Sequence, residues 1–210
     1  MKEKYTHINK IMFFKCGIGL CITGIAYFGI FDNYCVPSLL VALGVIFGFL
    51  GDVAGVSKRS KNISKAKKPL AVAIFFFMIG HFFFIAALVV LCVDALDALF
   101  LGVLLSAFTI PLTAKFLSVP AKDIRILGNI YIVVVCLMLG FALSYSFFTP
   151  SIHHRFASLF LIGAVLFWLS DYLLVFRNFN KFGMRMPHAV SLAPYYLGQL
   201  FISFSIFFIV

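Results

Sequence analysis

Charged residues are scarce in this chain. Asp, Glu, Lys and Arg make up 11% of its 210 residues, whereas hydrophobic residues make up 63%. A typical soluble domain has about 25% charged residues, and there are too few polar groups here to cover the surface of one. The composition therefore excludes an ordinary soluble domain.

Several catalytic and metal-binding motifs are also missing. The sequence has no G-x-S-x-G motif, no H-E-x-x-H motif and no Walker loop. Its five cysteines form no C-x-x-C pair and show no metal-ligand spacing. A disulfide between Cys35 and Cys92 is one interpretation of their positions, and membrane-buried free thiols are the favoured one. The alternating polarity of a membrane β-barrel is absent too.

What the sequence does contain is a series of long apolar runs, each able to cross the hydrocarbon core as a helix. The predicted spans are residues 11–31, 36–56, 70–92, 97–116, 124–148, 156–177 and 188–209. We therefore predict an all-α polytopic transmembrane bundle of seven spans, forming a single integral membrane domain over residues 1–210.

Basic residues are distributed unevenly between the two sides of these spans. The chain has 17 Lys and Arg, and all but Arg155 fall on the side of the N-terminus. The other side carries three acidic residues, Asp32, Asp94 and Asp97. The positive-inside rule makes the basic side cytoplasmic, so we expect the N-terminus, Lys61 and Lys181 inside and the C-terminus outside. The net charge of +10 then reflects topology and predicts no nucleic-acid partner.

Two carboxylates lie inside predicted spans, Asp52 in LGVIFGFLGDVAGV and Asp171 in GAVLFWLSDYLLVF. A charge at the centre of a membrane helix costs about 2.5–3.5 kcal/mol even on lenient scales, so such residues indicate function by default. Further polar residues in the spans are His81, Asn129, Tyr131, Tyr195, Tyr196 and Gln199. Most lie ~6–16 Å from the cytoplasmic helix ends at 1.5 Å per residue. This common depth predicts one cavity, open to the cytoplasm or inner leaflet, with both carboxyls on its wall.

Simpler interpretations of these residues exist. Asp52 lies near enough to a helix end to pair with Lys58 or Arg59. Asp171 lies within reach of Arg177. The remaining residues can be explained as a core histidine bonded to one carbonyl, as interfacial tyrosines and as amides that join helices. Against these, Asp52 shares a helical stripe with glycines, which indicates that it faces a neighbouring helix rather than lipid.

Five short segments together resemble a known family. They are GD at Gly51–Asp52, GH at Gly80–His81, Tyr131 followed by Met138 and Ala142, GAVLFWLSD at Gly163–Asp171, and YYLGQ at Tyr195–Gln199. The pattern resembles the YhhN-like membrane family, whose characterised members are lysoplasmalogenases. The chain departs from the family at Gly80, Phe84, Gly128–Asn129 and Pro194, where Ala, Tyr, a Pro-Val pair and Thr are usual. The family also commonly has eight spans, where this chain has seven.

The resemblance implies hydrolysis of the vinyl ether of a lysoplasmalogen to a fatty aldehyde and glycerophosphocholine or glycerophosphoethanolamine. This reaction needs no nucleophilic serine: one protonated carboxyl can supply the proton to the alkene carbon, and a second, ionised one can stabilise the cation and activate water. Asp52 and Asp171 are the expected catalytic pair, in either order. The six other polar residues are expected to bind substrate or water, and nearby basic loops to attract the phosphate. No cofactor or metal is required.

This interpretation makes a lysophospholipid and membrane lipid the expected partners, and places the protein in the cell (inner) membrane of a bacterial host. A proton-linked transporter or lipid-binding protein that uses the Asp pair as a relay is the alternative. A transporter should carry polar groups along both halves of its path, whereas the outer half of the predicted spans contains few polar residues. A purely structural membrane protein would leave both aspartates unexplained.

Overall fold

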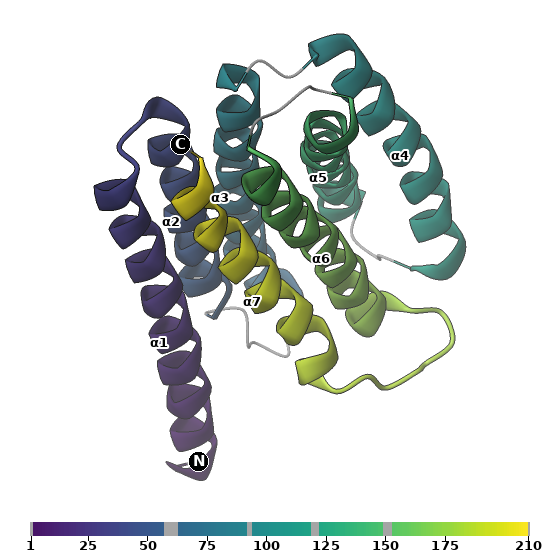
Figure 1. The fold of residues 1–210 in the computed structure, drawn as a ribbon. Helices are drawn as coiled ribbons and strands as arrows, with labels where there is room; N and C mark the ends of the chain where they lie inside the picture. Colours follow the sequence, from purple (N-terminus) through teal and green to yellow (C-terminus); the bar gives the residue numbers. More distant parts are fainter. Residues whose placement is uncertain (1, 57–62, 92–93, 119–121, 149–152, 210) are drawn as a thin grey trace.

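The computed structural model describes residues 2–56, 63–91, 94–118, 122–148 and 153–209. Its helices are α1 (Lys2–Asp32), α2 (Val36–Val56), α3 (Ile63–Val90), α4 (Ala95–Phe116), α5 (Lys122–Phe147), α6 (His154–Phe179) and α7 (His188–Ser205), followed by the 3₁₀ turn η1 (Ile206–Phe208). All seven α-helices are long and apolar enough to cross a membrane. The prediction of an all-α bundle with seven spans is confirmed (Figure 1).

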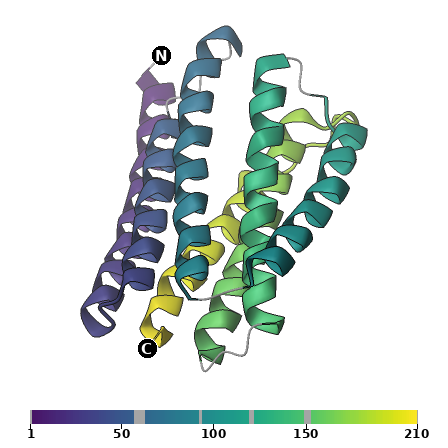
Figure 2. The same cartoon turned by 90° about the horizontal axis from the view of Figure 1, so that it is seen from above.

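Six of the helices form a ring. Around it, α1 packs on α2, α2 on α3, α3 on α5, α5 on α6, α6 on α7, and α7 on α1. The remaining helix, α4, packs mainly against α5 on the outside of the ring (Figures 1 and 2). The ring therefore encloses an interior to which α2, α3, α5, α6 and α7 contribute side chains.

Two helix pairs depend on glycine for their close contact. A Cβ on Gly140 of α5 would lie 2.5 Å from the backbone nitrogen of Gly102 on α4. A Cβ on Gly198 of α7 would lie 2.8 Å from the carbonyl oxygen of Gly163 on α6. Neither distance can be accommodated without moving a backbone, so these small residues set the helix spacing, as in other membrane bundles.

The ends of the bundle differ in charge. We call the end at which α1 begins and α2, α4 and α6 finish the basic end; it is at the bottom of Figure 1. At this end α3 begins at Ile63, seven residues before the predicted start of its span. Lys and Ala are good helix formers, so the helix continues past the apolar boundary.

Lys61, Cys92 and residue 210 lie outside the described residues, and Cys35 has a free thiol.

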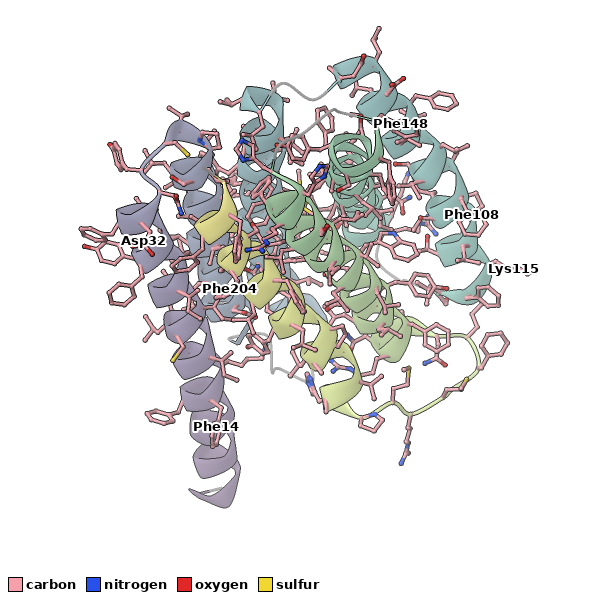
Figure 3. All side chains as sticks on the ribbon, in the orientation of Figure 1. Phe14, Asp32, Phe108, Lys115, Phe148 and Phe204 are labelled. Carbon is pink, nitrogen blue, oxygen red and sulfur yellow. The ribbon has the colours of Figure 1, made fainter. Side chains whose placement is uncertain are left out.

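The half of the bundle away from the basic end is filled by large side chains. Phe84, Tyr145, Phe156 and Phe160 are each no more than 2% exposed, and their rings pack edge to face or tilted. The outer surface carries exposed apolar residues, and Figure 3 shows side chains such as Phe108 projecting away from the bundle. Large buried rings therefore fill the core in this half of the bundle.

The positive-inside rule gives a testable orientation for this bundle. In a cysteine-free background, a cysteine introduced at Arg185, in the loop after α6, is expected to resist a membrane-impermeant thiol reagent added to intact cells. A cysteine at Asp32, at the end of α1, is expected to react. The reverse labelling pattern would invert the orientation, and equal labelling of both sites would contradict the five spans α2–α6 that separate them.

Candidate functional site

A large cavity, with a volume of about 390 Å³, lies between α3, α4, α5 and α6. This volume is within the range of small-molecule sites. Its wall is mainly aliphatic and aromatic, with Leu70, Ile74, Phe77, Ile132, Val135, Leu174, Val175 and Phe179 among the lining residues. The polar and charged lining residues are Thr109, Thr113, Ser118, Arg125, Asn129, Tyr131, Trp168, Asp171, Tyr172 and Lys181. A carboxyl in an otherwise apolar cavity is the feature that makes this a candidate active site.

Asp171 is held by a single side chain. The Tyr131 hydroxyl donates a hydrogen bond of 2.7 Å to its Oδ2 atom. No Lys or Arg within 4 Å of Asp171 is found in the described part of the chain. The predicted alternative, pairing with Arg177, is not what forms, because that guanidinium donates to Ser191 of α7 at 3.1 Å and contacts His188. The carboxyl of Asp171 therefore faces the cavity without a cation to balance a negative charge.

Asp52 has a different environment. It is 7% exposed, and its Oδ1 atom lies 3.5 Å from the ammonium nitrogen of Lys15 on α1. The alternative partners Lys58 and Arg59 lie outside the described residues. The hydroxyl of Tyr195 on α7 is also close to this carboxylate. Asp52 thus joins α1, α2 and α7, with a cation beside it.

A second, very small cavity lies next to Asp52. Its volume of about 10 Å³ is close to the space that one water molecule occupies. Its lining includes Tyr195, Tyr196 and Gln199 of α7. The Tyr196 hydroxyl and the Gln199 amide nitrogen are buried and have no hydrogen-bond partner in the described part of the protein. Buried donors of this kind are usually satisfied by ordered water, which gives this cavity a polar occupant of the right size.

Gly48 makes room for this arrangement. A Cβ at this position would lie 2.5 Å from the Gln199 amide nitrogen, and the Gly48 carbonyl accepts a hydrogen bond of 3.4 Å from Tyr195. The glycine stripe of α2 therefore faces α3 and α7, because the corresponding Cβ at Gly44 would meet the ring of Phe84. The sequence-based prediction that the Asp52 stripe faces protein is confirmed.

The two carboxyls do not share a cavity, so the prediction of a single one is wrong. Phe77 lines the large cavity, and its ring centroid lies 5.9 Å from that of Tyr195, which lines the small one. Phe167 completes the partition, with centroids 6.4 Å from Phe77 and 5.2 Å from Tyr195. The prediction rested on depth along each helix, and depth gives no information about aromatic rings that lie between two helices. Asn129, Tyr131 and Asp171 belong to one cavity, and Asp52, Tyr195, Tyr196 and Gln199 to the other.

His81 lines neither cavity. It is 1% exposed, and its Nδ1 atom donates a 2.7 Å hydrogen bond to the Phe77 carbonyl oxygen. Its ring lies edge-on to Phe167 and Tyr131, at centroid distances of 4.7 and 5.6 Å. The interpretation as a core histidine bonded to one carbonyl is confirmed, and the expectation that it forms part of the cavity wall is wrong. His81 instead fixes the backbone that carries the partitioning ring of Phe77.

Arg125, Lys181 and Trp168 are among the lining residues that were not named as site residues from the sequence. Arg125 and Lys181 were counted as topology charges in basic loops, which were expected to attract the phosphate only in general, and Trp168 was taken as a lipid-compatible residue. Helical spacing could have found two of them, because Arg125 lies four residues before Asn129 and Trp168 three before Asp171. Lys181 follows α6 in a loop, where no periodicity applies.

The Lys15–Asp52 pair should contribute to stability. Lys15→Met leaves a mostly buried carboxylate without its cation, which we expect to cost about 1–3 kcal/mol. The melting temperature of the detergent-solubilised protein should fall by roughly 2–12 °C. The double variant Lys15→Met/Asp52→Asn should recover most of this loss, since no unpaired charge remains. Additive losses in the double variant would contradict the pairing.

No curated protein and no solved structure matches the chain. Residues 11–206, almost the whole chain, match the family model described as the YhhN family. These residues include every span of the bundle and both cavities, and the protein therefore belongs to the YhhN family.

Proposed function

We propose that the protein is a membrane hydrolase of the lysoplasmalogenase type, which cleaves the vinyl ether of a lysoplasmalogen. Family membership and the membrane-spanning bundle support this class. The observation that carries the proposal is the contrast between the two buried carboxyls. Asp171 faces a substrate-sized, mainly apolar cavity and has no cation within 4 Å among the described residues, whereas Asp52 is paired with Lys15 beside a water-sized cavity.

The reaction needs one acid and one base. A proton is added to the vinyl carbon farther from the ether oxygen, and the double-bond electrons form the new C–H bond. Water then adds to the resulting oxocarbenium carbon and loses a proton. The hemiacetal breaks its bond to the glyceryl oxygen, which takes up a proton, and releases a fatty aldehyde. Two carboxyl groups in different environments are the usual means of supplying acid and base at one site.

Asp171 is assigned the acid role. A carboxyl in an apolar cavity with no cationic partner carries a proton at lower cost than one that is ion-paired. Tyr131, bonded to Oδ2, fixes its orientation toward the cavity, and Asn129 from the same helix lines the wall nearby. On this proposal the vinyl ether of the substrate binds next to the Asp171 carboxyl.

Asp52 is assigned the base role. Lys15 stabilises its ionised form, and the neighbouring cavity with the Tyr196 and Gln199 donors suits the attacking water. The rings of Phe77 and Phe167 lie between this small cavity and the substrate cavity. A rotation of the Phe77 side chain would let the water reach the oxocarbenium carbon after protonation. Side-chain rotations of this kind are fast compared with typical turnover.

A proton-linked transporter is less well supported. A transport path would need polar groups through the whole thickness of the bundle. The half away from the basic end is packed with buried aromatic rings such as Phe84 and Phe160, and the large cavity lies nearer the other end. A pocket open on one side suits an enzyme whose substrate enters and leaves from the same leaflet, which on the positive-inside rule is the cytoplasmic one.

The proposal is tested by incubating the purified protein with a lysoplasmalogen and, in parallel, with the 1-acyl and 1-alkyl lysolipids of the same headgroup. Fatty aldehyde is expected only from the vinyl ether. Free fatty acid from the acyl lipid, or no aldehyde from a well-folded preparation, would contradict the assignment.

A further inference from the structure

Two cations lie at the basic end of the large cavity. Arg125 comes from the first turn of α5, and Lys181 from the loop after α6. Among the lining residues that the structure describes, they are the only cationic ones, and Asp171 is the only acidic one. Both side chains are solvent-exposed, so they mark the mouth of the cavity rather than its interior.

Lys181 is held in place by the end of α4. Its ammonium donates to the carbonyl oxygens of Ala114 and Lys115, at 2.9 and 3.0 Å. Its backbone nitrogen donates to the Phe116 carbonyl at 3.1 Å, and the Ser118 nitrogen donates to Phe179 at 2.8 Å. An ammonium has three donors, so one remains for a ligand. The loop after α6 thus presents a fixed positive charge at the mouth.

Arg125 has no ion-pair partner in the part of the chain that the structure describes. No carboxylate within 4 Å of its guanidinium is found among the described residues. Arginine binds phosphate through paired N–H donors. Together with Lys181 it provides two cations beside an apolar cavity, which is the charge pattern expected for an amphipathic anion with a phosphate head.

The spacing along α5 fits such a molecule. Arg125 precedes Tyr131 by six residues, which is ~9 Å of helix. In a glycerophospholipid with a vinyl ether at the first carbon, about seven bonds separate phosphorus from the carbon that is protonated. An extended chain advances roughly 3.5 Å per three bonds, so this segment spans about 8 Å. A phosphate at the mouth would therefore bring the reacting carbon to the level of Tyr131 and Asp171.

We propose that Arg125 and Lys181 form a phosphate subsite that binds the headgroup of a single-chain glycerophospholipid and sets the depth of its ether bond. The identity of the reacting bond rests on the proposed function. The phosphate subsite itself rests on the two cations and the cavity. Arg125 and Lys181 act as specificity-determining residues, and the proton transfer is assigned to Asp171 alone.

The tryptophan of this chain gives a readout that does not depend on turnover. Trp168 is the only tryptophan in the sequence and lines the large cavity. Binding of a 1-O-alkyl lysophospholipid, which has no vinyl group to protonate, should change its fluorescence. The corresponding 1-O-alkylglycerol without phosphate should bind about tenfold more weakly.

Arg125→Gln is the decisive variant, and Lys122→Gln is its control, because Lys122 is an exposed cation on the same turn of α5 that does not line the cavity. Arg125→Gln should raise the Kd of the phosphate-bearing lipid about tenfold and leave that of the alkylglycerol unchanged. Lys122→Gln should change neither. An equal rise in the Kd of the phosphate-bearing lipid in Arg125→Gln and Lys122→Gln would overturn the subsite. So would an equal loss of affinity for the lipid and the alkylglycerol in Arg125→Gln.

Two further measurements, a titration with inorganic phosphate and an assay of aldehyde release, distinguish the subsite from the proposed reaction. Titration with inorganic phosphate should produce no comparable response, and binding as tight as that of the lysolipid would overturn the headgroup assignment. Aldehyde release from lysoplasmalogen that is unchanged in Arg125→Gln would also overturn the subsite, while leaving the proposed reaction in place. Arg125-dependent lipid binding without aldehyde release would reject the reaction and support the subsite.

Discussion

Asp171→Asn is expected to abolish aldehyde release from lysoplasmalogen, with a loss of at least 10²–10⁴-fold. Asparagine keeps the shape of the side chain and can still accept the Tyr131 hydroxyl, but it has no carboxylic proton to deliver to the vinyl carbon. Binding should survive, because the cavity wall is otherwise unchanged. The measurement is aldehyde release together with 1-O-alkyl lysophospholipid binding followed by Trp168 fluorescence.

The control for this variant is Asp97→Asn, which removes an exposed carboxylate in the first turn of α4, on the other end of the bundle. It should leave turnover unchanged. Tyr131→Phe should retain part of the activity, because it removes the hydrogen bond that orients Asp171 but not the acid. Turnover within tenfold of the wild type in a well-folded Asp171→Asn protein would mean that this aspartate is structural.

Asp52→Asn is expected to cause a comparable loss of turnover, although Asp52 does not border the substrate cavity. The neutral amide cannot accept the proton of the attacking water, and general-base groups contribute about 10²–10⁴-fold. Because the substrate cavity is untouched, binding of the 1-O-alkyl lysophospholipid should be unchanged. The loss should therefore appear in kcat and not in KM.

The ion pair with Lys15 complicates a simple reading of that result, since Asp52→Asn also leaves a cation without its partner. The double variant Lys15→Met/Asp52→Asn removes this difficulty. Its thermal stability should return close to that of the wild type, while its turnover should remain as low as that of Asp52→Asn. Recovery of activity in the double variant would show that Asp52 serves only to neutralise Lys15.

The membrane architecture could be predicted because hydrophobicity and length alone determine which segments cross a membrane. The spans 36–56 and 124–148 lie within two residues of α2 and α5. The polar residues of the site could be predicted for a related reason. Asp52, Tyr131, Asp171 and Gln199 are costly in lipid, so their presence in apolar runs indicates a protected interior.

How these residues are grouped could not be predicted. Asp52 and Asp171 lie at similar depths, but the rotation of each helix and the rings of Phe77 and Phe167 divide them between two cavities. Phe residues in a membrane helix can face either lipid or protein, so their sequence positions do not predict that their rings separate two cavities. The partner of Asp52 was also missed, because Lys15 comes from a different helix and not from the adjacent basic loop.

The most direct test of the central claim is the fate of the proton. Turnover of lysoplasmalogen in D₂O, with the aldehyde reduced as it forms and analysed by mass spectrometry, follows the bond that Asp171 is proposed to make. The account predicts one deuterium on the carbon next to the carbonyl in the product of the wild-type protein, and no enzyme-dependent product from Asp171→Asn. Aldehyde without deuterium at that carbon, or deuterated aldehyde formed equally well by Asp171→Asn, would contradict protonation of the vinyl ether by this residue.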